Sequence, residues 1–182
     1  MARRRSYPAV TADAPSHEQL LPLLAVAGRV ADHGSLRPWR LLEVRGNARD
    51  RLGGALAQAW ADAHQGAPED RERHAGRMAV KPLRAPLLIA IVAVHRISQK
   101  VTFWEQDAAA AGVAHLLSLA LDDAGWGVMW RTGSFTDSPQ VRAMHGLDET
   151  EHLLGWLYVG GRPPGALQHK SPLDPADFLT VL

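Results

Sequence analysis

The sequence contains no cysteine among its 182 residues. Disulfides, thiolate nucleophiles, dithiol redox motifs and cysteine-ligated metal sites are therefore excluded together. If this chain performs redox chemistry, a bound cofactor must carry it, because the sequence offers no redox-active thiol couple.

The sequence also has almost no net charge and no long hydrophobic run. Twenty Lys and Arg residues oppose nineteen Asp and Glu residues, which leaves a formal charge of +1 and no overall attraction to nucleic acid or acidic membranes. The longest apolar run, Leu87–Val94, is far shorter than the roughly 20 residues that a membrane helix requires. The basic residues Met1–Ser6 precede no apolar segment of a secretory signal. We therefore expect a cytoplasmic protein without a nucleic-acid or membrane partner.

The common catalytic motifs are missing as well. The only G-x-G sequence, Gly125-Trp126-Gly127, lacks a third glycine and precedes a predicted strand, so it is not a dinucleotide fingerprint. There is no P-loop, no G-x-S-x-G and no H-E-x-x-H, and the nine histidines show no metal-ligand spacing. These absences argue against a metal site and against metal or serine hydrolases.

What is present is enough apolar sequence for one core. Hydrophobic residues make up 46% and charged residues 21%, which predicts a single domain over residues 1–182. Helical and strand patterns alternate, which predicts a layered α/β or α+β domain with a mixed sheet flanked by helices. Leu87–Val94 is uniformly apolar and is predicted as the central strand.

The other predicted elements follow from caps, periodicity and turn residues. Ser16 opens a helix that Pro22 should kink and that should end near Val30. Pro68–Lys81 is highly charged and is predicted as an exposed helix or a mobile, disordered excursion. From Gly160 onward we expect an extended arm. Further helices are predicted at Ala48–His64 and Thr102–Ala124, a helix start at Ser138-Pro139, and further strands at Trp39–Val44, Gly127–Arg131 and His152–Val159.

Four short segments could carry a site, and each also has a structural interpretation. Arg3–Ser6 suits a phosphate, because arginine binds its oxygens bidentately, but taken alone a solvated basic tail is the more common explanation for such a terminus. Asp32–Arg40 is a polar loop of the kind that carries sites, or a surface turn anchored by one tryptophan. Trp130–Gly133 follows a strand and could meet a ligand, or simply leave the sheet. Trp104–Asp107 reads first as a helical N-terminal turn, unless a dimer partner covers it.

Taken in order, these segments resemble the short-chain, YdjA-like branch of the FMN-dependent nitroreductase family over nearly the whole chain. The resemblance rests on the ordered series and not on any single motif. Its parts are Arg4-Arg5-Ser6, Asp32-His33 with Ser35 and Pro38-Trp39-Arg40, Arg84-Ala85-Pro86, Trp104-Glu105-Gln106, and Gly125 through Trp130-Arg131-Thr132-Gly133 to Ser138-Pro139.

The resemblance implies an α+β nitroreductase-like fold, an interwoven homodimer, and FMN held at two interface sites that both chains line. It also implies NAD(P)H as a transient co-substrate. The FMN contacts it implies are Arg4, Arg5, Ser6, Arg29, His33, Trp130, Arg131 and Thr132, and the nicotinamide-binding residues it implies are Ala120, Leu121, Asp122, Asp123, Ala124 and Gly125.

The activity expected from this resemblance is ping-pong electron transfer from NAD(P)H to a small electron-poor acceptor such as a nitroaromatic or a quinone. No side chain need act as nucleophile or dedicated acid, so no catalytic residue is assigned. Three alternatives stay open at this point: another flavin chemistry on the same fold, a non-enzymatic flavin or small-ligand binding protein, and a structural dimer with an empty pocket.

Overall fold

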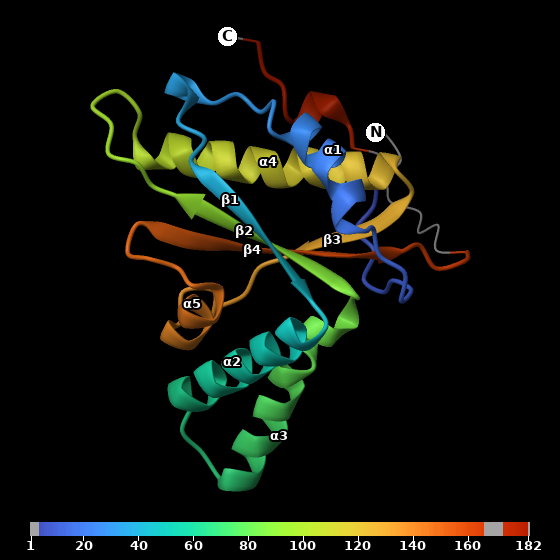
Figure 1. Ribbon diagram of the computed structural model, residues 1–182, viewed down its shortest axis with the longest axis vertical. Coiled ribbons are helices and arrows are strands. Elements are labelled where there is room, and N and C mark those ends of the chain that lie inside the picture. Colours follow the sequence, from blue (N-terminus) through green and yellow to red (C-terminus); the bar gives the residue numbers. More distant parts are fainter. Residues whose placement is uncertain (1–3, 166–172, 182) are drawn as a thin grey trace.

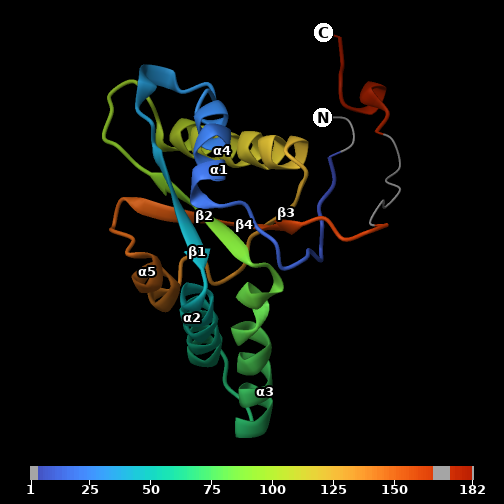
Figure 2. The ribbon, with the colours of Figure 1, turned by 45° about the vertical axis from the view of Figure 1, so that its right-hand side comes forward.

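The computed structural model describes residues 4–165 and 173–181, and its organising feature is one four-stranded sheet with helices on both faces (Figure 1). Helices α1 and α4 cover one face, and α2, α3 and α5 lie on the other side, as a second direction of view also shows (Figure 2). The helices are α1 His17–Ala27, α2 Asn47–Ala63, α3 Pro68–Ala79, α4 Phe103–Asp123 and α5 Pro139–His145; the strands are β1 Trp39–Arg45, β2 Leu87–Val94, β3 Trp126–Arg131 and β4 Glu151–Gly161; and three 3-10 turns are η1 His33–Ser35, η2 Lys81–Arg84 and η3 Pro175–Asp177.

The strand order is β1-β2-β4-β3, and each of the three pairings is antiparallel. The prediction of a mixed sheet is therefore wrong for the described strands. The reason lies in the connections: α2 and α3 return the chain to β2 at the end of the sheet where β1 finished, and such a return pairs neighbours antiparallel.

The central strand β2 supplies apolar side chains to both faces, as its uniform composition predicted. Its residues up to Ala93 are all buried. Leu87, Ile89 and Ile91 pack with α1 and α4, whereas Leu88, Ala90 and Val92 pack with α2 and α5, because alternate strand residues point to opposite faces.

The two predicted caps, at Ser16 and Ser138, are confirmed: Ser16 and Gln19 form a capping box at α1, and Ser138 caps α5. At α4, where the sequence predicted a helix without a named cap, Thr102 and Glu105 form a second capping box. Helix α1 stops at Ala27, three residues before the predicted end, because the backbone tightens after it and the N–H of Val30 bonds to the carbonyl of Ala27.

The structure also decides the charged segment after α2 and the segments near the C-terminus. Pro68–Ala79 is a helix that packs beside α2, so of the two predicted alternatives the helix is confirmed and the disordered excursion is wrong. Strand β4 extends to Gly161, two residues beyond the predicted end at Val159. Of the predicted extended arm, residues 166–172 lie outside the described residues, and residues 175–177 form a 3-10 turn.

Candidate flavin site

The end of β3 brings Trp130, Arg131 and Thr132 against Gly155 of β4. Gly155 has φ +119°, and a Cβ atom built there would lie 2.5 Å from the carbonyl oxygen of Arg131 and 3.0 Å from Nε1 of Trp130. A side chain at this position would therefore push the strand end away. No signal in the sequence singled out Gly155.

Trp130 and Arg131 point to opposite faces of the sheet, as consecutive strand residues must. The indole Nε1 of Trp130 donates to the carbonyl oxygen of Leu154 at 3.2 Å, and its ring meets His115 of α4 edge-on at 5.0 Å between centroids. The guanidinium carbon of Arg131 lies 5.2 Å from the ring centroid of Tyr158. Arg131 thus faces the side of the sheet covered by α2 and α5.

On that side the structure has a pocket of about 340 Å³, within the range of small-molecule sites. Its lining carries three cations, Lys81, Arg84 and Arg131, and no carboxylate. Sequence reasoning did not assign Lys81 or Arg84 to a site, although Arg84 belongs to the Arg-Ala-Pro series quoted above. The remaining lining residues are Leu56, Met78, Met129, Trp130, Thr132, Gly133, Ser134, Phe135, Thr136, Trp156 and Tyr158.

Arg131 joins this pocket to the N-terminal segment. Its Nη2 donates to the carbonyl oxygen of Pro8 at 3.3 Å, and the N–H of Tyr7 donates to the carbonyl of Val128 at 3.1 Å. The Nε of Arg131 is buried without a hydrogen-bond partner among the described residues. A buried donor left unsatisfied is costly and is expected to find a partner in a ligand or water. Arg4, Arg5 and Ser6 precede Tyr7 directly, whereas Arg3 lies outside the described residues.

The phenol of Tyr158 forms part of the pocket wall. Burial raises the pKa of Tyr158, and the nearby charges of Arg131 and Arg84 oppose that rise. The phenol is therefore neutral at physiological pH and adds no negative charge to the pocket.

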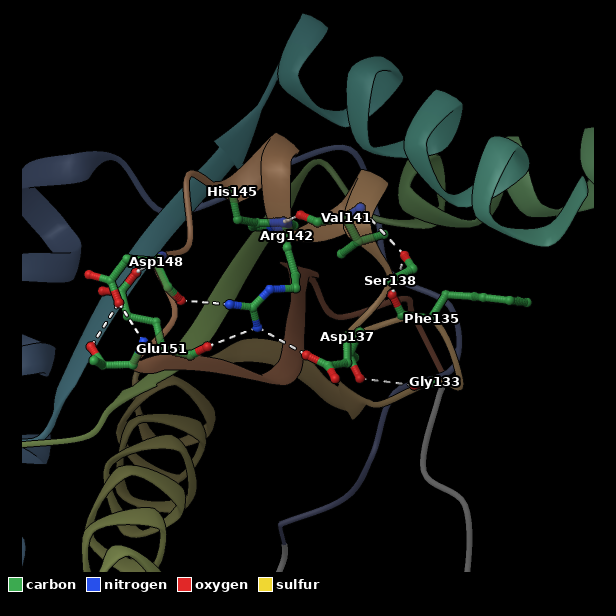
Figure 3. Close-up of polar contacts among 11 residues, drawn as sticks. Gly133, Phe135, Asp137, Ser138, Val141, Arg142, His145, Asp148 and Glu151 are labelled. Carbon is green, nitrogen blue, oxygen red and sulfur yellow. Dashed lines mark hydrogen bonds and ion pairs between the residues drawn. The ribbon is translucent and has the colours of Figure 1, made fainter. Parts of the chain in front are cut away.

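The loop that follows β3 is held by Arg142 of α5 (Figure 3). The Arg142 guanidinium donates from Nη1 to Oδ1 of Asp137 at 3.0 Å and to the carbonyl of Glu151 at 3.0 Å, and from Nη2 to the carbonyl of Asp148 at 2.6 Å (Figure 3). Ser138 caps α5 by accepting from the N–H of Val141. The Arg142 guanidinium therefore fixes the position of the loop after β3 relative to β4.

Arg29 and His33, two predicted FMN contacts, do not reach this pocket within one chain. Arg29 lines a separate groove of about 500 Å³ on the α1 side, together with Arg37 and Trp39. That groove shares no lining residue with the pocket at Arg131. His33 instead bonds through Nδ1 to Oε2 of Glu105 at 3.0 Å, and this bond holds the pKa of Glu105 below its ordinary value.

The loop that carries His33 has an unusual backbone. Ser35 and Arg37 both have positive φ, 51° and 47°, which non-glycine residues adopt at a cost. The carboxylate of Asp32 compensates by accepting from the N–H groups of Leu36 at 3.2 Å and Arg37 at 2.7 Å. The polar loop Asp32–Arg40 is therefore a fixed turn with strained residues, which is a feature of functional loops.

The predicted nicotinamide-binding segment, Ala120–Gly125, forms the end of α4 and the turn into β3. Leu121 is fully buried, and Oδ1 of Asp122 accepts from Nη2 of Arg162 at 2.8 Å. Gly125 has φ +92°, as expected for a residue that ends a helix. None of these residues lines the pocket or the Arg29 groove, and their role stays a prediction.

Residues 1–161 match the model of the nitroreductase family. The chain belongs to the nitroreductase family. It is 34% identical over 181 residues to YdjA of Escherichia coli (strain K12), whose name assigns it provisionally to the NAD(P)H nitroreductases; the match covers 99% of this chain and 96% of that protein. A Haemophilus influenzae protein with the same provisional name is 28% identical over 183 residues, which cover 100% of this chain and 97% of that one.

Solved structures agree with the fold. A nitroreductase-like family protein from Bacillus cereus has a TM-score of 0.82 at 21% identity, over 99% of this chain and 92% of that chain. The FMN-dependent nitroreductase NfnB from Mycobacterium smegmatis, solved with NADPH, has a TM-score of 0.76 at 18% identity, over 100% and 95%. The expected α+β nitroreductase-like fold is confirmed, and the family makes this chain an oxidoreductase enzyme.

Across residues 4–165 and 173–181, no three His, Asp or Glu side chains gather as a metal site would require. In the same residues, no helix combines the length and the apolar character needed to cross a membrane.

Proposed function

We propose that this enzyme is a homodimer that binds FMN and transfers electrons from NAD(P)H to a small electron-poor acceptor, a nitroaromatic or a quinone, by a ping-pong mechanism. The observation that carries the proposal is the pocket at Arg131, whose charged lining is wholly cationic. Such a lining suits a ligand that bears a phosphate and gains negative charge when it is reduced.

The residues present fit FMN in one further respect. The buried Nε of Arg131 has no partner among the described residues, so it can donate to a flavin oxygen without losing an existing bond. Arg4, Arg5 and Ser6 directly precede Tyr7 and Pro8, which contact Val128 and Arg131 of β3, and their guanidinium and hydroxyl groups would hold the phosphate and ribityl chain. Thr132 and the backbone of Trp130, which also line the pocket, would complete the ring contacts.

The separation of Arg29 and His33 from the pocket supports the dimeric part of the proposal. One chain carries the Arg131 pocket on one face and the Arg29 groove on the other. A second copy that presents its Arg29 and His33 to this pocket would complete each site with residues from both chains. The exposed side chains of Phe103 and Trp104 at the start of α4 are also typical of an interface.

A bound flavin accepts a hydride from NAD(P)H and passes two electrons to the acceptor. For a nitroaromatic acceptor, the net reaction is NAD(P)H + H⁺ + ArNO₂ → NAD(P)⁺ + ArNO + H₂O. In this scheme Arg131, Lys81 and Arg84 stabilise negative charge, and the pocket wall orients the planar ligand. Water supplies or takes up the proton, so no side chain is assigned as a dedicated acid or nucleophile.

The test is the visible absorption spectrum of the purified protein after incubation with FMN and desalting, followed by anaerobic addition of NADH or NADPH. Retained flavin bands that bleach on addition support the proposal. Retained flavin that neither nucleotide bleaches favours a flavin-binding protein without this activity, and absence of retained flavin favours the dimer with an empty pocket.

A further inference from the structure

A basic groove adjoins the pocket at Arg131 and is not explained by the proposed flavin contacts. It has a volume of about 440 Å³ and lies where α2, the end of α3 and η2 meet. Met78, Lys81 and Arg84 line both the groove and the pocket, so the two spaces lie side by side. The residues that line the groove alone are Trp60, His74, Arg77 and Val80.

The charges of this groove have one sign. Arg77, Lys81 and Arg84 lie within eight positions of one another, and none makes an ion pair with a described residue. No Asp or Glu lines the groove. The helix C-terminus can favour a cation at Arg77, but it does not account for Lys81 and Arg84, which follow the helix.

The acidic residues of α3 lie in its N-terminal half. They are Glu69, Asp70 and Glu72, at the end far from the sheet, and Asp70 is already paired with Arg73 (Figures 1 and 2). The C-terminal end of α3, which carries Arg77, lies beside the pocket. Arg77 and Arg84 are exposed, so water screens their mutual repulsion, and both are accessible to an anionic ligand.

Aromatic rings form part of the groove lining. The Trp60 ring stacks with His64, at 4.3 Å between centroids, and with His74, at 5.2 Å, and Trp60 and His74 both line the groove. The stacking holds these two lining rings in a fixed arrangement. We propose that the groove binds the anionic group, a carboxylate or a phosphate, of a substrate whose planar ring would meet the flavin in the adjoining pocket.

This inference rests on the proposed function and adds the charge of the substrate to it. The anionic group has two possible sources: the acceptor itself, as an aromatic carboxylate, or the 2′-phosphate that distinguishes NADPH from NADH. The two half-reactions of the ping-pong scheme separate them, because each exposes the protein to only one of these ligands.

The acceptor arm compares 4-nitrobenzoate with 4-nitrobenzamide, which have similar shape but differ in charge. Reduced flavoprotein is mixed with each compound in a stopped-flow instrument, and benzoate and benzamide are titrated against the oxidised protein by flavin difference spectra. We expect tighter binding of the anion by about twofold to fivefold for each cation engaged. Arg77→Gln should lower the anion-to-amide ratio and Arg77→Glu should invert it, whereas Arg51→Gln, a matched charge removal on exposed α2, should keep it.

The nucleotide arm compares flavin bleaching by NADPH and NADH in the same variants. If the phosphate is the ligand, the NADPH-to-NADH affinity ratio falls in Arg77→Gln and the benzoate ratio does not. The inference is overturned if neither ratio responds to position 77. Trp60 lines the groove, so tryptophan fluorescence can follow the binding of benzoate and NADPH even if the protein retains no flavin. This measurement tests the groove separately from the proposed flavin activity.

Discussion

Trp156 of β4 donates a hydrogen bond from its indole Nε1 to Nε2 of His145 at 3.1 Å. The other ring nitrogen of His145, Nδ1, lies 2.8 Å from the carbonyl oxygen of Val141. An indole nitrogen can only donate and a carbonyl can only accept, so His145 must be neutral with its proton on Nδ1. Trp156 lines the pocket, and the imidazole therefore fixes one wall of the proposed flavin site.

The first prediction concerns pH. Burial lowers the pKa of His145 below 6.5, and the charge of Arg40 lowers it further. The unfolded chain therefore binds a proton in a range where the folded protein does not, and the free energy of unfolding should fall as the pH drops below about 6.5, levelling off below the folded pKa. Urea unfolding between pH 5 and pH 8 measures this dependence.

A glutamine at position 145 can donate to the carbonyl of Val141 and accept from Trp156 but cannot titrate. In His145→Gln the slope of the free energy of unfolding against pH between 5 and 6.5 should therefore be smaller than in wild type. The variant should also lose less flavin than wild type when the pH is lowered from 7.5 to 5.5. An unchanged slope would show that other groups carry the pH dependence. His64→Gln, at an exposed position, serves as the control.

The second prediction concerns the ion pair between Arg40 of β1 and Glu151 of β4. Nε and Nη2 of Arg40 bond to the two carboxylate oxygens of Glu151 at 2.5 and 2.7 Å, and the side chain of Glu151 is only 8% exposed. Glu151→Gln should lower the free energy of unfolding by about 1–3 kcal/mol, because Arg40 loses a charged partner. Chemical denaturation measures this loss.

The hydrogen bonds from Arg40 hold the pKa of Glu151 below its ordinary 4.5. The stabilisation by this pair is therefore present above about pH 4.5 and is lost as the pH falls through the folded pKa. Asp70→Asn, which removes the exposed pair with Arg73, is the matched control and should change stability little. Equal losses of unfolding free energy in Glu151→Gln and Asp70→Asn would contradict the idea that burial makes the Arg40–Glu151 pair the stronger one.

The third prediction contrasts two neighbouring glycines of α2. A Cβ atom at Gly53 would collide with the carbonyl oxygen of Ala79 where α2 and α3 pack, whereas a Cβ at Gly54 meets nothing within 4 Å. Gly53→Ala should destabilise the protein by roughly 1–3 kcal/mol through overpacking. Gly54→Ala should stabilise it by about 0.5–1 kcal/mol, because alanine favours the helix. Thermal unfolding of both variants checks the opposite signs.

The fourth prediction concerns Arg131. Arg131→Ala removes a pocket cation and its buried donor, and should raise the dissociation constant for FMN by about tenfold or more, or slow flavin reduction by NAD(P)H. Flavin fluorescence titration and stopped-flow absorbance measure the two effects. Arg51→Ala removes an equal charge from exposed α2 and should change neither. Unchanged FMN affinity and unchanged reduction in Arg131→Ala would remove this residue from the site.

Local patterns in the sequence determined most of the secondary structure. Ser16 and Ser138 predict helix starts because each caps through a residue three positions away, and Leu87–Val94 predicts a strand buried on both faces because it is apolar throughout. The ordered series from Arg4 to Pro139 determined the family, which the comparisons confirm.

Only the tertiary structure decided what lies beside what. The antiparallel pairing of β2 with β1 and β4, the close approach that requires Gly155, and the neutral state of His145 depend on residues far apart in the sequence. The cations Lys81 and Arg84 share a pocket with Arg131 although some fifty positions separate them, whereas Arg29 does not reach it within one chain. Chain composition limits which groups are available, but packing across the sheet decides which of them meet.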